Sequence, residues 1–597
     1  MSIHLTPIVI AFLYLVSSAI SGWASGDEAS NFVTHAESEL EILGALSERA
    51  EFLNRTDETE EHTRISTEAS RIARERRVIL AKQAAHFAGR TLPDDVARKL
   101  GLMQLAITIP APSNPERSKV LSETITKLQT NYTTAENCTD RPQCRTKDQL
   151  YRVMRESRDP EVLLSAWMEW RMPARAIRAP YAEMVAIANE GARELRFNDV
   201  GALWRSVYDM SPEAFLAEYR KMWDQVQPLY KALHCHVRAK LREYYGDIVP
   251  QHGLIPAHLL GTMWAENWSS IAGLVGPGGA DRRINLTELL ESKGFTPRDI
   301  VRTEESFFNS IGFSKLPRSF WERSMLEKPK GRKVNCHESA WEIESRQADV
   351  RMSMCIESNE RDFFVVHHEL GHIYYYLAYA RQSYLFRSGA NPGFHEAIGD
   401  AIGLSITPAY LKDIGLLDEP PSEAEDLPFL FRTALEKIPQ LAMAIVVDLW
   451  RWGVFSGEIK PERYNESWWN LQRNYQGLAP PIARDESDFD AGMFYHISNN
   501  VPYDRYFVAN ILQFDFHRAL CEAAGQRDPL HRCSIFGSRD AGKRLAEALT
   551  LGASRPWFDA MEKLTGRRVM DASSILKYFG PVAEWLEAEN RERRCGW

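Results

Sequence analysis

The sequence predicts a large, mostly α-helical protein with few short strands. Apolar residues spaced among charged ones, a pattern typical of helices with one solvated face, run through residues 30–105 and resume at 181–197. Only residues 327–355 carry a stretch in which short strands are plausible. We find neither repeats nor a clear linker. We therefore expect one large domain over residues 26–597, although a length of 597 residues by itself favours about two to four domains.

Composition and charge argue against two classes of partner. The chain is 44% hydrophobic and 26% charged, which is ordinary for a globular protein. Its net charge is -9, its pI is about 6.0, and no basic stripe is apparent. We therefore expect no nucleic-acid partner and no binding to anionic membrane surfaces.

Residues 1–25 have the features of an export signal. The apolar run IVIAFLYLVSSAI is too short to span a bilayer comfortably, and the small residues of SGWASG suit cleavage near residue 25. An uncleaved anchor is the alternative, because little positive charge precedes the run. With no second long apolar run, we expect a secreted, extracellular glycoprotein without a membrane anchor. Sequons occur at Asn54, Asn131, Asn137, Asn267, Asn285 and Asn465.

The eight cysteines, an even number in an exported chain, are compatible with a set of disulfides. Two of them, Cys235 and Cys595, lie far apart, and the sequence leaves open whether they pair. The other six form three pairs that are close in sequence and would each close a short loop: Cys138 and Cys144, Cys336 and Cys355, and Cys521 and Cys533.

The segment VVHHELGHIYYYL, at 365–377, contains a candidate metal site. His368 and His372 are four residues apart, so they share one face of a helix, and at this spacing two imidazoles can bind one Zn²⁺. Glu369 lies one step round the same turn, within reach of a water on the metal. The alternative is a chance match, which about a few per cent of such chains would contain. The motif therefore needs a third ligand.

A second segment, GANPGFHEAIGDAIGL at 389–404, supplies that ligand. Asn391-Pro392-Gly393 predicts a helix start, and Glu396 follows it. Two antiparallel helices would place Glu396 opposite the two histidines. This ligand set leaves zinc one open position for a water whose pKa the metal lowers. Asp400, four residues after Glu396 on the same face, is suited to orient a ligand histidine through its far ring nitrogen.

These two segments closely resemble those of the angiotensin-converting enzyme family of zinc dipeptidyl carboxypeptidases. The resemblance covers most of the chain from about residue 30 and includes IPAHLLGTMWAENWSSI, FWERSMLEKP, CHESAW, WRWGVFSGEI, YNESWWNLQRNYQGLAPP, HISNNVPYDRYFVANILQFDFHRALC and LGASRPW. It implies a two-lobed helical ellipsoid with a deep central active-site groove and N-terminal lid helices. It also implies that the three short cysteine pairs are disulfides.

The resemblance implies a catalytic residue set. The zinc ligands match the two histidines and Glu396, and Glu369 matches the general base that deprotonates the water and later protonates the leaving amine. Tyr506 matches the tyrosine that stabilises the tetrahedral oxyanion. His496 matches a histidine that holds the scissile region by hydrogen bonds. This set is chemically coherent, since amide hydrolysis needs a Lewis acid, a base and preorganised donors.

The resemblance also implies how substrate is bound. His337 matches a second hydrogen-bonding histidine, and Ala340 matches a backbone contact to the substrate chain. In typical members a glutamine, a lysine and a tyrosine hold the substrate's terminal carboxylate. Tyr503 keeps the tyrosine here, but Glu266 stands at the glutamine position and Phe494 at the lysine position. The pocket has lost a cation and gained an anion.

Further departures fall in or near the same pocket. Gln440 and Asn510 stand where family members have two aromatic residues, and Glu338 stands where they have an alanine before Ser-Ala. Drift in a tolerant pocket is one explanation. We favour changed specificity because the changes converge on one subsite. We therefore expect weak release of dipeptides from free-acid substrates, and relatively better cleavage of peptides with an amidated or basic C-terminus.

The family's two chloride sites are matched only in part. Arg171, Trp468 and Arg505 match anion-site residues. A second arginine of the first site appears as Gln472, and the tyrosine of the second site aligns with His236. The sequence thus predicts one zinc ion and leaves chloride dependence open.

Two functions are compatible with these motifs. The first is a secreted zinc metallopeptidase of the dipeptidyl carboxypeptidase type, which acts on short peptides. The second is a catalytically weakened, secreted, zinc-containing peptide-binding protein. Retention of the ligands, the base Glu369 and the oxyanion residue Tyr506 favours the first, because a binding protein has no use for that combination.

Overall fold

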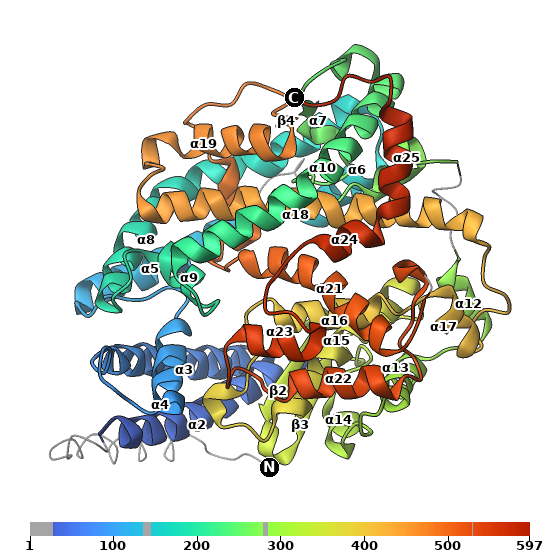
Figure 1. Ribbon diagram of the computed structural model, residues 1–597. Helices are drawn as coiled ribbons and strands as arrows, with labels where there is room; N and C mark the ends of the chain where they lie inside the picture. Colours follow the sequence, from blue (N-terminus) through green and yellow to red (C-terminus); the bar gives the residue numbers. More distant parts are fainter. Residues whose placement is uncertain (1–27, 135–144, 279–283, 528) are drawn as a thin grey trace.

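The computed structural model describes residues 28–134, 145–278, 284–527 and 529–597 (Figure 1). Most of these residues lie in α-helices, and the strands within these ranges form only two short sheets. The predicted mostly α-helical class is therefore confirmed. The predicted signal peptide at 1–25 and the cysteine pair Cys138 and Cys144 lie outside the described residues.

The helices fall into two groups, one above and one below the middle of Figure 1. The upper group consists of α5 (Pro115–Thr134), α6 (Lys147–Glu156), α7 (Pro160–Arg171), α8 (Arg175–Glu194), α9 (Val200–Ser206), α10 (Pro212–Tyr245), α18 (Asp426–Ser456), α19 (Tyr464–Leu471) and α25 (Gly580–Asn590). Helices α11 (Ala272–Val275), α20 (Tyr495–Ser498) and α24 (Ser573–Tyr578) are shorter.

The lower group contains the elements that carry the metal-site motifs. It consists of α12 (Leu286–Ser292), α13 (Pro297–Ile311), α14 (Arg318–Arg323), α15 (Glu360–Tyr379), α16 (Phe394–Gly403), α17 (Pro408–Asp413), α21 (Asp504–Ala523), α22 (Arg539–Leu549) and α23 (Trp557–Thr565), together with three N-terminal helices. Helix α21 packs against both α16 below and α18 above, so it joins the two groups.

The N-terminal helices form a layer at one side of the lower group (Figure 1). They are α2 (Glu28–Thr56), α3 (Glu60–Ala85) and α4 (Asp94–Leu105), which confirms the helical pattern predicted over 30–105. Thr59 starts α3 by accepting a hydrogen bond from the His62 N–H, which satisfies one donor of the first turn. Phe52 of α2 packs edge-on against Trp341, with ring centroids 5.7 Å apart. This layer is therefore anchored to a strand of the body.

The strands are short. β2 (Ser339–Glu344) pairs with β3 (Asp349–Ser353) as an antiparallel hairpin, within the 327–355 region where strands are predicted. β1 (Ile255–Pro256) pairs in parallel with β4 (Leu478–Ala479). Helix α15 packs against both strands of the hairpin, so the hairpin lies beside the helix that carries the HExxH motif.

One helix, α18, is long and apolar enough to cross a membrane by length and composition. In the fold, however, 89% of its most apolar window is buried inside the protein. This burial explains why that part of the helix is so apolar, since a central helix of a globular core packs against neighbours on most of its surface.

Three disulfides lie within the described residues. The expected pairs Cys336–Cys355 and Cys521–Cys533 are present. The structure also answers the question that the sequence left open, because Cys235 of α10 bonds to Cys595, 360 residues away. This bond fixes the C-terminal segment to the upper group of helices.

Candidate active site

Two helices that cross at unusually close range form the centre of the site. A β-carbon added to Gly371 of α15 would lie 2.9 Å from the Gly399 Cα, and one added to Gly399 of α16 would lie 2.7 Å from the Nδ1 of His368. Any side chain at either position would push the helices apart. The two glycines therefore let α15 and α16 approach until the residues of the two motifs meet.

The predicted metal ligands converge where these helices cross. The Nε2 atoms of His368 and His372 lie 3.0 Å apart, and the Nε2 of His368 lies 3.4 Å from an oxygen of Glu396. Ligand atoms about 2.0–2.1 Å from one tetrahedral Zn²⁺ are separated by roughly 3.3 Å. The donor set and its spacing therefore fit a zinc ion. As predicted, α16 starts just after Asn391-Pro392-Gly393 and carries Glu396 in its first turn.

Asp400 lies where the sequence predicts it. Its Oδ1 is 3.1 Å from the Nδ1 of His368, the ring nitrogen that faces away from the other ligands. Its Oδ2 accepts a hydrogen bond from the Lys437 ammonium of α18 at 3.3 Å. Lys437 was not predicted, because it lies 37 residues further along the chain and no local pattern links it to Asp400.

His372, the second ligand histidine, is held by a series of contacts that was not predicted from the sequence. The Nδ1 atoms of His372 and His395 are 3.3 Å apart, and the Nε2 of His395 lies 3.2 Å from the Tyr379 hydroxyl. Tyr379 in turn donates to Glu342 of β2 at 3.3 Å. One sequence signal was available: Tyr379 follows His372 by seven residues, so it shares the ligand face of α15.

Glu369 is almost fully buried, with 6% of its surface exposed. Its Oε2 has no hydrogen-bond partner among the described residues. Burial raises the pKa of this carboxyl to about 7, while the nearby His368 lowers it. A buried carboxyl with an unpaired oxygen beside the ligand set is suited to accept a proton from a small molecule at the site.

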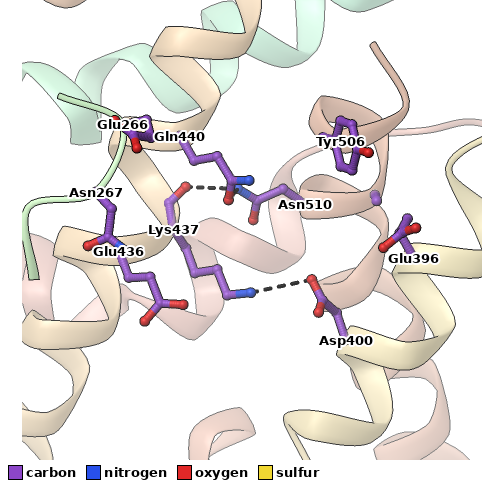
Figure 2. Close-up of a pocket in the computed structure, with 10 residues that line it drawn as sticks. Glu266, Asn267, Glu396, Asp400, Glu436, Lys437, Gln440, Tyr506 and Asn510 are labelled. Carbon is purple, nitrogen blue, oxygen red and sulfur yellow. Dashed lines mark hydrogen bonds and ion pairs between the residues drawn. The ribbon is translucent and has the colours of Figure 1, made fainter. Parts of the chain in front are cut away.

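Three aromatic residues, one from α20 and two from the start of α21, lie together. The ring centroids of His496 and Tyr506 are 5.2 Å apart, and Tyr503 lies 4.6 Å from His496 and 5.1 Å from Tyr506. Tyr506 and Glu396 line the same cavity (Figure 2). Burial lowers the pKa of His496 to about 3, so this imidazole is neutral near pH 7.

The hairpin edge brings the remaining predicted substrate contacts beside α15. The Ala340 carbonyl accepts a hydrogen bond from Tyr376 of α15 at 3.5 Å. His337 lies just before β2, and its carbonyl accepts a hydrogen bond from Arg55 of α2. Glu338 is paired with Arg361 at 2.6 Å. The hairpin edge is thus tied both to the HExxH helix and to the N-terminal layer.

A cavity of about 370 Å³ lies between α16 and α21 on one side and α18 on the other (Figure 2). Glu266 lies on its wall and accepts a hydrogen bond from Thr262 at 2.6 Å. The Asn510 amide donates to the Lys437 carbonyl at 2.8 Å. The cavity is lined by Glu266, Asn267, Glu396, Asp400, Glu436, Lys437, Gln440, Tyr506, Ala509 and Asn510.

Phe494, which stands at the lysine position, packs against aromatic neighbours. Its ring is 5.2 Å from Tyr503 and 5.3 Å from Trp264, edge-on in both cases. Tyr503 is buried, and this burial raises its pKa. Phe494 therefore brings an apolar ring, and no charge, to this side of the site.

The first predicted anion site has two buried donors. The Nε of Arg171 and the Nε1 of Trp468 have no hydrogen-bond partner within the described chain. Arg171 stacks 4.5 Å from the Trp264 ring, and Trp468 is edge-on to the same ring at 6.1 Å. Gln472 is buried in the following turn. Two unpaired buried donors near one ring are compatible with a small anion.

Two residues bear on the second predicted anion site. His236 lies 2.7 Å from the Val275 carbonyl and packs against Trp585 at 4.7 Å. It is Tyr208 that lies near Arg505, which lowers the pKa of that hydroxyl while burial raises it. Tyr208 is therefore a tyrosine that the fold brings close to Arg505, and the alignment of the tyrosine position with His236 stays a prediction.

The fold and the ligand geometry together define a class: a helical protein in which an HExxH motif meets a glutamate from a second helix, as in zinc metallopeptidases. The chain belongs to the angiotensin-converting enzyme family, whose model, described as Angiotensin-converting enzyme, matches residues 24–597. The predicted family resemblance is therefore confirmed.

The similarity to individual relatives is substantial. The chain is 39% identical to the angiotensin-converting enzyme of Bos taurus over 591 residues, which are 96% of this chain and 44% of that protein. It is 43% identical to the angiotensin-converting enzyme of the leech Theromyzon tessulatum over 452 residues, which are 74% of this chain and 72% of the relative. The chain thus spans less than half the length of the bovine protein.

Proposed function

We propose that this protein is a secreted zinc metallopeptidase that hydrolyses short peptides near the C-terminus, in the manner of a peptidyl-dipeptidase. One observation carries the proposal. Nitrogens of His368 and His372 and an oxygen of Glu396 converge at 3.0 and 3.4 Å, beside the buried, unpaired carboxyl oxygen of Glu369. Membership of the angiotensin-converting enzyme family over residues 24–597 supports the metallopeptidase class.

Each residue of the site has a separate role in the hydrolysis. Zinc held by the two histidines and Glu396 would acidify a water at its open position and polarise the scissile carbonyl. Glu369, whose pKa burial raises to about 7, takes a proton from the attacking water and gives it to the leaving amine. The Tyr506 hydroxyl donates to the carbonyl oxygen as negative charge develops on it. Asp400 fixes the ring of His368 through the contact at 3.1 Å.

Substrate is positioned by groups on both sides of this centre. His496 is neutral near pH 7, since burial lowers its pKa to about 3, and can hydrogen-bond the scissile region. His337 and the backbone of Ala340, at the edge of the hairpin, hold the substrate chain. Tyr503 offers one neutral hydroxyl to the terminal carboxylate. Phe494 adds no positive charge, so we expect a weak grip on a free carboxylate.

The cellular setting belongs to the same proposal. The apolar run within residues 1–25 supports a cleaved signal, and the three described disulfides support an oxidising compartment. The unpaired donors of Arg171 and Trp468 support a chloride ion at the first anion site.

The function is tested by incubating the purified protein with a small peptide library and identifying the products by mass spectrometry, with and without a chelator. We expect dipeptide release that the chelator abolishes. Glu369→Ala should keep its zinc and lose hydrolysis by several orders of magnitude. Substantial activity in this variant would contradict the assigned base. Peptide binding by the wild type without any products would favour the weakened binding protein instead. One peptide compared as free acid and as amide measures the carboxylate preference.

A further inference from the structure

The cavity beside the metal ligands has an unusual balance of charge. Four of its ten lining residues carry carboxyl groups, and one, Lys437, carries a positive charge (Figure 2). A divalent ion bound at Glu396 would still leave negative charge in excess. A ligand that enters this cavity therefore meets a surface that favours cations over anions.

The one cation of the cavity already has a partner. The Lys437 ammonium lies 3.3 Å from Asp400, the residue that also contacts His368. Asp400 raises the pKa of Lys437 against the effect of burial, as does the neighbouring Glu436. Taking Lys437 away to hold a peptide carboxylate would leave Asp400 without its counter-charge in a buried place. Lys437 is therefore part of the support of the metal site.

Two carboxyls remain for a ligand. Glu266 lies on one wall, where burial raises its pKa; the Thr262 hydroxyl donates to it at 2.6 Å, and this contact and nearby backbone N–H groups lower the pKa in part. Glu436 also lines the cavity, and its side chain is exposed. Within the described residues it makes no hydrogen bond or ion pair, although its charge raises the pKa of Lys437. Arg171 also lowers the pKa of Glu266, but its guanidinium is stacked on the rings of Trp167 and Trp264 and is not among the residues that line the cavity.

The rest of the lining is polar and neutral. Asn267, Gln440 and Asn510 present amide groups, and Ala509 is the single apolar residue. Their oxygens already accept hydrogen bonds within the described chain, Asn267 from Ser269, Gln440 from Asn510 and Asn510 from Gln513, so these amides make the wall polar and the carboxylates remain the groups that favour a cation. The volume of about 370 Å³ accommodates a long side chain.

We propose that this cavity receives the cationic side chain, lysine or arginine, of the substrate's C-terminal residue, with Glu266 and Glu436 as the carboxylates that bind it. The inference rests on the proposed function, because it assigns the substrate class of the same site. It makes Glu266 and Glu436 specificity-determining residues, and it explains the polar replacements Gln440 and Asn510 as parts of one binding site.

The test separates binding from hydrolysis by using Glu369→Ala protein that has been loaded with zinc. Three peptides, identical except for a C-terminal lysine, norleucine or glutamate with a free carboxylate, are titrated calorimetrically. We expect the lysine peptide to bind about 10- to 100-fold more tightly than the norleucine peptide, as is typical of a charge-assisted hydrogen bond, and the glutamate peptide to bind most weakly. Added salt should reduce the difference in part.

The double substitution Glu266→Gln and Glu436→Gln, made in the Glu369→Ala background, should bring the lysine and norleucine affinities within about threefold of each other. Glu547→Gln, an exposed glutamate of α22 far along the chain from the cavity residues, is the matched control and should keep the preference. Circular dichroism and zinc content establish that each variant is folded and loaded.

The outcomes distinguish this inference from the proposed function. A lysine preference that the double substitution removes supports the inference, even if the wild type hydrolyses no peptide and the proposed function fails. Equal binding of lysine and norleucine peptides overturns it, even if the wild type releases dipeptides from both. A lysine preference that persists in the double variant also overturns it, since the preference then comes from other residues.

Discussion

Tyr506 lies at the edge of the cavity with its hydroxyl on the side of Glu396, while its ring packs against His496 and Tyr503 (Figure 2). The ring contacts fix the position of the hydroxyl, and removing the oxygen should leave them intact. We therefore expect Tyr506→Phe to lower kcat by roughly 10²–10³ and to change KM little, because the hydroxyl acts mainly on the oxyanion. Steady-state kinetics on one peptide measures both constants. A raised KM with unchanged kcat would assign Tyr506 to substrate binding instead.

His395 contacts the metal-ligand residue His372 and positions its ring. Its ring packs against Tyr375 with the ring centroids 4.3 Å apart, and its nitrogens bridge His372 and Tyr379. His395→Phe keeps a ring of similar size and removes both polar contacts. We expect zinc affinity to fall by about 10–100-fold, as is typical when the partner of a ligand histidine is lost. Competition with a chelator measures this affinity without any assay of activity.

Tyr379→Phe is the matched variant for His395→Phe. It removes only the outer contacts, to His395 and to Glu342, so its loss of zinc affinity should be smaller. Wild-type zinc affinity in His395→Phe would show that the contact with His372 has no bearing on the metal.

Individual residues differ in how far the sequence predicted them. His368, His372, Glu396 and Asp400 were predictable because helical spacing alone places each pair on one face. Lys437 was not, because it reaches the site from a helix whose position depends on packing of the whole fold. The proximity of Tyr208 to Arg505 was not predictable for the same reason.

At the scale of elements, the site depends on the crossing of α15 and α16. A methyl group at Gly399 would lie 2.9 Å from the His368 carbonyl oxygen and closer still to its ring. We expect Gly399→Ala to lower the free energy of unfolding by about 1–3 kcal/mol, the usual effect of overpacking, and to weaken zinc binding because His368 moves. Urea denaturation and chelator competition measure the two effects.

Gly403, in the same helix, is the control for Gly399. A β-carbon there meets nothing within 4 Å, and alanine favours a helix more than glycine does. Gly403→Ala should therefore leave zinc binding unchanged and the free energy of unfolding equal or slightly higher. If Gly399→Ala behaved in the same way, the close crossing would not be what positions the ligands.

The positions of helices and strands along the chain were predicted better than the contacts between them. The helical pattern over 30–105, the hairpin within 327–355 and the start of α16 all follow from local signals. The proximity of α18 to α16, which forms the cavity, and the Cys235–Cys595 bond do not, because they join segments far apart in the chain. Local rules carry no information on such long-range pairings.

At the scale of the whole molecule, the N-terminal layer is attached to the body along the hairpin. The backbone N–H of Asn335 donates to the Arg55 carbonyl at 2.8 Å, and that of Glu58 donates to the Lys333 carbonyl at 2.8 Å. Two carboxyls face this junction, Glu48 from α2 and Glu342 from β2. Burial raises the pKa of each to about 7, and Glu48 further raises that of Glu342.

These raised pKa values predict how the junction responds to pH. A carboxyl with a pKa of about 4.5 in the unfolded chain and about 7 in the folded protein holds its proton more tightly when folded. The folded state is therefore favoured below about pH 4.5, and this contribution is lost as the pH rises towards 7, where the carboxyl ionises in a buried place.

We expect Glu342→Gln, which cannot ionise, to lose less stability than the wild type between pH 5 and pH 7.5. Other buried carboxyls contribute to the wild-type slope, so the difference between the two proteins isolates the contribution of Glu342. The free energy of unfolding in urea at several pH values measures both slopes. Adding Glu48→Gln should flatten the dependence further, because it removes the second ionising group of the junction. Equal slopes in the wild type and in Glu342→Gln would mean that this carboxyl is ionised in the folded protein throughout the range, and that the N-terminal layer is attached independently of pH.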